Sequence, residues 1–516
     1  MNGAQALIRT LVAAGVDVCF ANPGTSEMHF VAALDDVPEM RGVLTLFEGV
    51  ATGAADGYAR MAGKPAATLL HLGPGLANGL ANLHNARRGR APVVNVVGDH
   101  ARSHKRLDAP LESDLDALAG AVSGWLRRSL SPADVAADAA EAVAESARRG
   151  IATQVLPADV SWEDGAEPAQ PQPVRPAPQV APSVVDDVAA VLRSGEPTVL
   201  FLGGDVVASE EALLAAGQVA AGTGARLLAE TFSARTVRGA GLPDLPKLPY
   251  PPEMAIAALA GTRHLVLAGA ASPVHFFGYP GVPGTPVPED CRVHVLSALG
   301  EDGAAAVRAL AEVTAPEARA EVLEASRPEL PTGELTPRAV SAVVGALLPE
   351  RAIVVDEALT SGVGLAELTA GAPRHDWLAL TGGAIGDGLP MAVGAAVACP
   401  DRPVLALQAD GSAMYTIQSL WTMAREQLDV TVVVYDNGSY AILQHELSRV
   451  GAAEDGKRAG ELLHLGTPSL DFVALATGMG VTATRATTAE ELAAQLRAAL
   501  TEPGPHLVQA VLPGRR

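Results

Sequence analysis

The sequence predicts an α/β protein with three domains, each a mostly parallel sheet flanked by helices. Short β-branched runs alternate with Ala-rich helical runs along the chain, a pattern typical of parallel sheets covered on both faces. Proline-containing stretches at residues 163–183 and 326–337 favour extended, semi-rigid linkers. We therefore expect domains at residues 1–162, 184–325 and 336–516, which agrees with the usual ~150 residues per domain.

The expected strands and helices follow one another in the order that this fold class requires. We expect strands at residues 16–20, 66–71, 92–98, 198–202, 264–268, 352–356, 404–409 and 430–435. We expect helices at residues 4–14, 76–87 and 418–426, and a further helix from residue 209. Ligands of such sheets bind beyond the carboxyl ends of the strands. The polar residues and glycines that follow each strand are therefore the candidate site residues.

Composition excludes several classes of function. Acidic residues outnumber basic ones by 58 to 37, and a net charge of −21 disfavours nucleic acid and anionic membrane surfaces as partners. The three cysteines, Cys19, Cys291 and Cys399, form no CxxC pair and no disulfide framework. The sequence has no signal-peptide pattern and no uncharged apolar run of ~18 residues. We therefore expect a cytoplasmic protein that does not enter a membrane.

Two neighbouring strand ends carry the strongest chemical signal. Asp410, Gly411 and Ser412 follow one expected strand, and Asn437 follows the next. A right-handed crossover brings both ends to the same edge of the sheet. There the Asp410 carboxylate, the Asn437 side-chain oxygen and a carbonyl of the next turn offer the hard oxygen ligands that Mg²⁺ prefers. Gly411 allows close approach of a ligand, and Ser412 with the helix N-terminus suits a diphosphate. A helix cap and an Asn-Gly turn would explain each half separately, but the two together are more specific.

These residues resemble the thiamine-diphosphate motif of the family that includes acetolactate synthase, pyruvate decarboxylase and benzoylformate decarboxylase. That motif is Gly-Asp-Gly, somewhat over twenty residues, and Asn-Asn. Here residues 409–411 read Ala-Asp-Gly and residues 436–437 read Asp-Asn, so two positions depart from the motif. The resemblance implies thiamine diphosphate and Mg²⁺ as cofactors, with Asp410, Asn437 and Ser439 as the metal ligands. The extra Asp adds negative charge near the diphosphate.

The resemblance extends over most of the chain. Segments similar to the family's motifs lie at residues 22–27, 47–49, 55–60, 71–75, 382–386 and 389–390. It implies that Glu48 hydrogen-bonds N1′ of the aminopyrimidine and so activates the cofactor. It further implies that Gly383 offers a carbonyl to the 4′-amino group and that Ile385 supports the bent cofactor. Glu357 and Thr360 follow a strand and fit a diphosphate or substrate edge. Without the resemblance, Glu48 would be a helix-surface residue and Ile385 a core residue.

Three further positions resemble the substrate-binding side of benzoylformate decarboxylase. His71 matches a catalytic His of that enzyme, Thr25 falls at its active-site Ser, and His275 corresponds to its second His. A neutral His moves protons near pH 7, although surface or satisfied core histidines are the alternative interpretation. Asp99 and His100 end another strand, where many relatives place a Gln. The sequence therefore differs from those relatives at a position that bears on how the acceptor substrate of the carboligation is bound.

The resemblance implies an acetolactate-synthase-like carboligase. Such an enzyme decarboxylates pyruvate or a similar 2-oxo acid and adds the acyl carbanion to a second carbonyl. A non-ligating decarboxylase of the benzoylformate decarboxylase type and a non-catalytic cofactor-binding regulatory subunit are the alternatives. The family places its cofactor between the first domain of one subunit and the third of another, which implies a homodimer or homotetramer. FAD is possible but not favoured, because Gly203-Gly204 after a strand is not a GxGxxG run.

Overall fold

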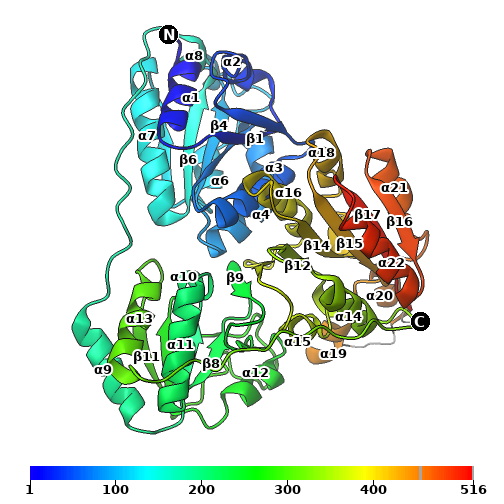
Figure 1. Ribbon diagram of the computed structural model, residues 1–516. Coiled ribbons are helices and arrows are strands. Elements are labelled where there is room, and N and C mark those ends of the chain that lie inside the picture. The colour runs from blue at the N-terminus through cyan, green and yellow to red at the C-terminus, as the bar shows by residue number, and fades with distance from the viewer. Residues whose placement is uncertain (453–455, 514–516) are drawn as a thin grey trace.

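The computed structural model describes residues 1–452 and 456–513, which form three sheets flanked by helices (Figure 1). The first sheet is parallel, with strand order β2-β1-β3-β4-β6-β5. Its strands are β1 Val18–Ala21, β2 Arg41–Leu44, β3 Ala66–Leu70, β4 Val93–Asp99, β5 Trp125–Arg128 and β6 Ile151–Pro157. Its helices are α1 Gly3–Ala13, α2 Met28–Ala33, α3 Glu48–Ala62, α4 Leu72–Arg88, α5 Arg102–Lys105, α6 Leu115–Gly120, α7 Pro132–Arg149 and α8 Ala158–Trp162. Helices α1 and α7 cover one face, and α3, α4 and α6 cover the other.

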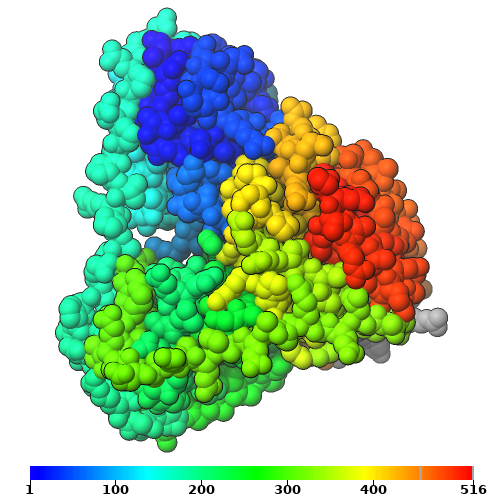
Figure 2. Space-filling model, in the orientation of Figure 1, coloured from blue at the N-terminus to red at the C-terminus, as the bar shows by residue number. Residues whose placement is uncertain are grey.

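The middle sheet is smaller and also parallel, with strand order β11-β10-β7-β8. Its strands are β7 Thr198–Leu202, β8 Arg226–Ala229, β10 His264–Ala268 and β11 Arg292–Ser297. The accompanying helices are α9 Pro182–Arg193, α10 Gly204–Val207, α11 Glu210–Thr223, α12 Pro252–Leu259 and α13 Gly303–Thr314. An extended stretch without helix or strand links α8 to α9, and Figure 2 shows the surface hollowed beside it, between the first and middle parts.

The third sheet has the order β16-β17-β15-β14-β12-β13-β9, in which β9 alone is antiparallel to its neighbour. Its strands are β9 Arg235–Arg238, β12 Ile353–Glu357, β13 His375–Ala379, β14 Val404–Ala409, β15 Val430–Asp436, β16 Thr482–Ala486 and β17 His506–Val511. Its helices are α14 Pro337–Leu347, α15 Leu365–Leu368, α16 Gly388–Ala398, α17 Asp410–Ala413, α18 Ser419–Arg425, α19 Ala441–Arg449, α20 Lys457–Leu462, α21 Phe472–Gly478 and α22 Ala489–Ala499. Strand β9 comes from the middle segment, so that segment contributes to two sheets.

Helices α3 and α16 join the first and third sheets into one hydrophobic core. Glycines allow the two helices to touch. A Cβ atom on Gly57 would lie 2.1 Å from the Met391 carbonyl oxygen, and one on Gly394 would lie 1.9 Å from that of Ala54. A side chain at either position would therefore force the helices apart. The close contact between the two helices sets the position of the first sheet relative to the third.

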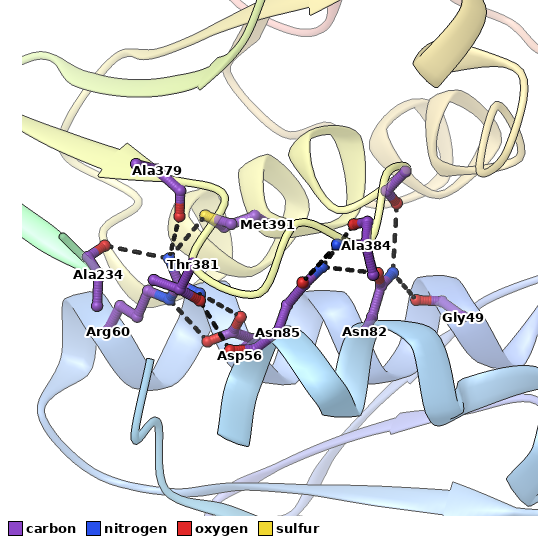
Figure 3. A network of polar contacts seen from close by, with 11 residues as sticks. Gly49, Asp56, Arg60, Asn82, Asn85, Ala234, Ala379, Thr381, Ala384 and Met391 are labelled. Carbon is purple, nitrogen blue, oxygen red and sulfur yellow. Dashed lines mark hydrogen bonds and ion pairs between the residues drawn. The ribbon is translucent and has the colours of Figure 1, made fainter. Parts of the chain in front are cut away.

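A buried ion pair ties this joint to the middle segment. Arg60 Nε donates to Asp56 Oδ1 at 2.7 Å, and Arg60 Nη2 donates to Oδ2 at 2.6 Å. Arg60 Nη1 also donates to the carbonyl oxygens of Ala379, at 2.7 Å, and Ala234, at 3.1 Å (Figure 3). Ala234 directly precedes β9, so a single guanidinium connects all three parts of the chain. Among the described residues, no helix is both long and apolar enough to cross a bilayer.

Candidate active site

A cavity of about 130 Å³ opens at the carboxyl ends of β14 and β15. These strands are parallel neighbours, so the turns that follow them meet at one edge of the sheet. The lining brings together the three expected metal ligands and four of the five expected cofactor-binding residues: Thr360, Ile385, Asp410, Gly411, Ser412, Asn437 and Ser439. We call this the C-terminal cavity.

Backbone N–H groups hold the Asp410 carboxylate in this cavity. Gly411 donates to Oδ1 at 2.7 Å, while Asn437 and Gly438 donate to Oδ2 at 3.1 and 2.7 Å. Burial raises the pKa of Asp410 to about 6, and the nearby charge of Asp436 acts in the same direction. A divalent cation would favour the ionised carboxylate here. Together with the side-chain oxygen of Asn437, this donor set fits a hard cation such as Mg²⁺.

Asp436, the charged departure from the family motif, does not line the C-terminal cavity. Its Oδ2 accepts a hydrogen bond from Gln509 Nε2 at 2.7 Å, on the neighbouring strand β17. Its carboxylate is therefore engaged within the sheet, and it acts on the site through its charge.

The segment expected to grip the aminopyrimidine is a glycine-containing turn whose backbone is held by a buried carboxylate. Gly383 and Gly386 have φ values of +76° and +96°, a region that favours glycine. The buried Glu357 carboxylate accepts the N–H groups of Gly386, at 2.7 Å, and Gly388, at 2.8 Å. The sequence suggested a diphosphate or substrate edge for Glu357. The structure instead shows it fixing the backbone of the turn that carries Ile385.

Helix α4 of the first part holds the same turn from the other side. Asn85 exchanges two hydrogen bonds with the backbone of Ala384, at 2.7 and 3.1 Å, and Asn82 Nδ2 contacts the Gly386 carbonyl oxygen at 3.3 Å (Figure 3). These amide side chains therefore fix the backbone of the turn relative to α4.

A second, larger cavity of about 470 Å³ lies at the carboxyl edge of the first sheet, and we call it the N-terminal cavity. It follows β1, β3, β4 and β6 and contains two expected catalytic residues, Thr25 and His71. Its full lining is Thr25, Ser26, His71, Leu72, His100, Ala101, Ser103, His104, Leu111, Ala158 and Trp162. The two cavities share no lining residue.

His71 is oriented by a buried carboxylate that the sequence motif contained but that we did not single out. Its Nδ1 lies 2.8 Å from Oε2 of Glu27, a residue only 2% exposed. Oε2 of Glu27 also accepts the Gly24 N–H at 2.7 Å, and Oε1 accepts the Ser26 hydroxyl at 2.7 Å. A Cβ on Gly98 would lie 1.7 Å from Oε1, so glycine at that position makes room for the carboxylate. A partner at Nδ1 leaves Nε2 of His71 for the cavity.

Glu48 lies close to His71. It is the first residue of α3 and is 7% exposed, and its Oε2 accepts a hydrogen bond from Asn78 Nδ2 at 3.0 Å. A Cβ atom on Gly75 would lie 3.3 Å from Glu48 Oε1 and 3.2 Å from the His71 Cβ. The structure therefore groups Glu48, His71 and Thr25 at the first sheet.

His275 belongs to the other group. It comes from the middle segment, and the ring of the next residue, Phe276, lies 2.6 Å from where a Cβ on Gly383 would be. Nε2 of His275 is buried, and within residues 1–452 and 456–513 it has no hydrogen-bond partner. Of the two histidines that resemble those of benzoylformate decarboxylase, His71 lines the N-terminal cavity, whereas His275 lines neither cavity and precedes a residue that packs against Gly383. The Phe276 contact left no signal in the sequence, because it joins segments more than a hundred residues apart.

Comparisons with known proteins agree with this arrangement. Residues 1–119 match the "Thiamine pyrophosphate enzyme, N-terminal TPP binding domain", and residues 362–510 match the corresponding C-terminal TPP binding domain. A Mycobacterium tuberculosis protein, provisionally named acetolactate synthase large subunit IlvX, is 64% identical over 99% of both chains. Benzoylformate decarboxylase of Pseudomonas aeruginosa is 30% identical over 96% of both chains.

A solved structure gives the same result. The thiamine diphosphate-dependent 4-hydroxybenzoylformate decarboxylase of Rhodococcus jostii RHA1 superimposes over the full length of both chains, with a TM-score of 0.86 and 25% identity. Both family domains, the relatives and the shared fold lead to one conclusion: the chain belongs to the thiamine pyrophosphate enzymes and is a thiamine diphosphate-dependent enzyme.

Proposed function

We propose that this enzyme is an acetolactate-synthase-like carboligase that decarboxylates pyruvate or a similar small 2-oxo acid and joins the remaining acyl unit to a second carbonyl. The observation that carries the proposal is the C-terminal cavity, where Asp410, Asn437 and Ser439 meet at one strand edge. The 64% identical relative, named as an acetolactate synthase large subunit, supports the carboligase assignment.

The chain's residues would divide the work as follows. Asp410, Asn437 and Ser439 would hold Mg²⁺ and, with Gly411, Ser412 and Thr360, the diphosphate. Gly383 and Ile385 would orient the aminopyrimidine, and Glu48 would exchange a proton with its N1′. Bound thiamine diphosphate supplies the electron sink for decarboxylation, and the protein supplies binding and orientation. Thr25, His71 and His275 would contact the substrate.

A complete site would need two copies of the chain. Glu48 and His71 line the edge of the first sheet, whereas the expected metal ligands line a separate cavity of the third sheet. A homodimer, or a homotetramer built from two dimers, would bring the N-terminal cavity of one copy to the C-terminal cavity of the other. We place this assembly in the cytoplasm because its three cysteines are all free.

A specific observation favours a second candidate, simple decarboxylation of an aryl 2-oxo acid. His71, oriented by Glu27, is suited to deliver a proton to the product, which would yield an aldehyde instead of a ligated product. The benzoylformate decarboxylase relative at 30% identity supports this alternative.

The test is proton NMR of the purified protein with pyruvate, with and without thiamine diphosphate and Mg²⁺. Cofactor-dependent acetolactate or acetoin is the expected result. Acetaldehyde alone, or benzaldehyde from benzoylformate, would favour the decarboxylase. If both acids stay unchanged, the carboligase proposal fails for them, and the non-catalytic regulatory subunit gains support.

A further inference from the structure

The third sheet contains a buried glutamine near the end of an otherwise apolar strand. Gln408 lies in β14, between Leu407 and Ala409, and is 0% exposed. Fully buried glutamines are uncommon, and their polar atoms are usually held by hydrogen bonds. In the register of the sheet, Gln408 pairs with Glu357, the last residue of β12, so the two side chains stand side by side on one face.

The side-chain amide of Gln408 joins two parts of the expected cofactor site. Its Nε2 donates to Oε2 of Glu357 at 2.7 Å and to Oγ of Ser412 at 2.9 Å. The same Glu357 carboxylate accepts the N–H groups of Gly386 and Gly388, which belong to the turn expected to hold the aminopyrimidine. Ser412 is expected at the diphosphate and lines the C-terminal cavity. A continuous chain of hydrogen bonds therefore runs from the turn to the cavity wall.

The chemistry of the partners fixes the direction of these hydrogen bonds. An ionised carboxylate has no proton to donate, so the NH₂ group of Gln408, and not its carbonyl oxygen, faces Glu357. Because Ser412 Oγ accepts from this NH₂ group, its own proton goes to another acceptor, the Ala409 carbonyl oxygen at 3.1 Å. Oε1 of Gln408 is buried and, within residues 1–452 and 456–513, has no partner. An unpaired buried acceptor costs about 1–3 kcal/mol, so stability alone would favour an apolar residue at this position.

Glycine at position 388 makes room for the contact between Gln408 and Glu357. A Cβ atom on Gly388 would lie 2.4 Å from Gln408 Oε1 and 2.8 Å from Glu357 Oε2. Any side chain there would push the amide or the carboxylate away. The turn, the carboxylate and the amide are thus in direct contact, and moving one of them would move the others.

We propose that Gln408 is a positioning residue that fixes the turn carrying Ile385 relative to Ser412, so that both ends of thiamine diphosphate bind together. A ligand anchored at two ends binds tightly only if its two sites have the right spacing, because the second contact then forms at a high effective concentration. The inference rests on the part of the proposed function that assigns this turn to the aminopyrimidine and Ser412 to the diphosphate. Gln408 itself does not line the C-terminal cavity and acts through Glu357 and Ser412.

The test compares a ligand that uses both ends of the site with one that uses only the diphosphate end. Isothermal titration of the whole enzyme with thiamine diphosphate, and separately with pyrophosphate, both in the presence of Mg²⁺, gives the two affinities. Gln408→Met keeps the length of the side chain and removes the NH₂ group. We expect thiamine diphosphate to bind about 10- to 100-fold more weakly, the range for residues that orient a metal ligand, and pyrophosphate to change by less than about threefold. Retained pyrophosphate binding also shows that the variant is folded.

Gln154→Met is the matched control. Gln154 is also a 0% exposed glutamine in a parallel strand, β6, and its Nε2 donates to the Ser129 hydroxyl at 2.9 Å. It lines neither cavity, so both affinities should stay unchanged. Equal affinities of wild type and Gln408→Met for thiamine diphosphate would overturn the proposal. Equal losses for the two ligands would also overturn it, because Gln408 would then act at the diphosphate end alone.

A double variant tests the route through Glu357. Glu357→Gln alone should weaken thiamine diphosphate binding, because it alters the acceptor of the turn's N–H groups. If Gln408 acts through Glu357, adding Gln408→Met should weaken binding little further. Losses that multiply would mean that the two residues act independently, which contradicts the proposal. None of these measurements uses turnover, so they remain readable even if the enzyme proves not to be a carboligase.

Discussion

The carboxyl edges of the first and third sheets share an architecture and differ in chemistry. The C-terminal cavity is small and presents oxygen atoms, from Asp410 and Asn437, beside backbone N–H groups. The N-terminal cavity is more than three times larger and presents imidazoles, from His71 and His100, among apolar walls. Both stand where parallel strands end, so the residues after the strands, and not the fold, decide what each edge can do. Under the proposed function, the edge of the third sheet would hold the charged end of the cofactor, and the edge of the first sheet would bind the 2-oxo acid and move protons.

The largest expected effect is on cofactor binding at the C-terminal cavity. Asp410→Ala should weaken Mg²⁺-dependent thiamine diphosphate binding at least about 100-fold, because even the residues that orient a metal ligand are worth 10- to 100-fold. Isothermal titration in the presence of Mg²⁺ measures it. Asp436→Asn is the comparison variant: that carboxylate faces Gln509, lies outside the cavity lining and acts on the site only through its charge, so the change in binding should be much smaller than for Asp410→Ala. Equal losses in both variants would contradict Asp410 as the metal ligand.

Glu48→Gln should distinguish most clearly the role of the first-sheet edge in turnover from the role of the third-sheet edge in cofactor binding. Loss of general acid–base function lowers turnover about 10²- to 10⁴-fold. Thiamine diphosphate should still bind within a few-fold, because the residues expected to bind Mg²⁺ and diphosphate are untouched. Turnover and titration on the same preparation check both statements. Exposed Glu39→Gln should change neither, and full activity in Glu48→Gln would refute the role of Glu48.

The third effect tests whether the N-terminal edge depends on how His71 is oriented. Glu27→Gln removes the carboxylate that receives the His71 Nδ1 hydrogen bond and should lower kcat about 10- to 100-fold, as for residues that orient a functional His. KM and cofactor affinity should change little. Ser26→Ala removes only a hydroxyl next to the same carboxylate and should cost less. A Glu27→Gln variant that lost cofactor binding instead would show that Glu27 supports the fold, not His71.

Strands with a strong local signal could be predicted from the sequence. Residues 198–202, 264–268 and 404–409 coincide with β7, β10 and β14, because buried apolar runs bounded by turn residues leave little ambiguity. Helix α4 starts at Leu72, earlier than the expected residue 76. Its Gly-Pro-Gly segment looked like a loop, yet a proline is well tolerated in the first turn of a helix. Strand β9 was missed because its four residues have no apolar alternation and pair with a strand over 130 residues away.

The candidate site shows the same limit. Asp410 and Asn437 could be paired from the sequence because a single crossover connects their strands. The contact of His71 with Glu27 depends on β1 and β3 being neighbours, which no local pattern indicates. The role of Glu357 was misjudged for a related reason. The position of Glu357 at the end of a strand was evident from the sequence. The N–H groups that donate to its carboxylate, those of Gly386 and Gly388, belong to a turn about thirty residues later, and no local pattern indicates that contact.

The smallest expected effect concerns the middle domain, which lines neither cavity. Glu230 follows β8, and burial raises its pKa to about 7, although the Gly204 N–H at 3.4 Å opposes the shift. The folded carboxyl binds its proton more tightly than the unfolded one. Stability from this group is therefore complete below about pH 4.5 and is lost as the pH rises through about 7. Glu230→Gln removes this dependence, so relative to wild type it should gain about 1–3 kcal/mol between pH 5 and pH 8.

Hydrogen exchange of the β7 and β8 amides at the two pH values is the appropriate measurement, because a three-domain chain need not unfold in a single step. Exposed Glu253→Gln should show no such difference. The pH profile of turnover should be the same in wild type and Glu230→Gln, since Glu230 contacts neither cavity. Any pH dependence of turnover that both proteins share then belongs to the two sheet edges. A shifted profile in Glu230→Gln would mean that the middle domain acts on the site, and that the two edges alone do not account for its chemistry.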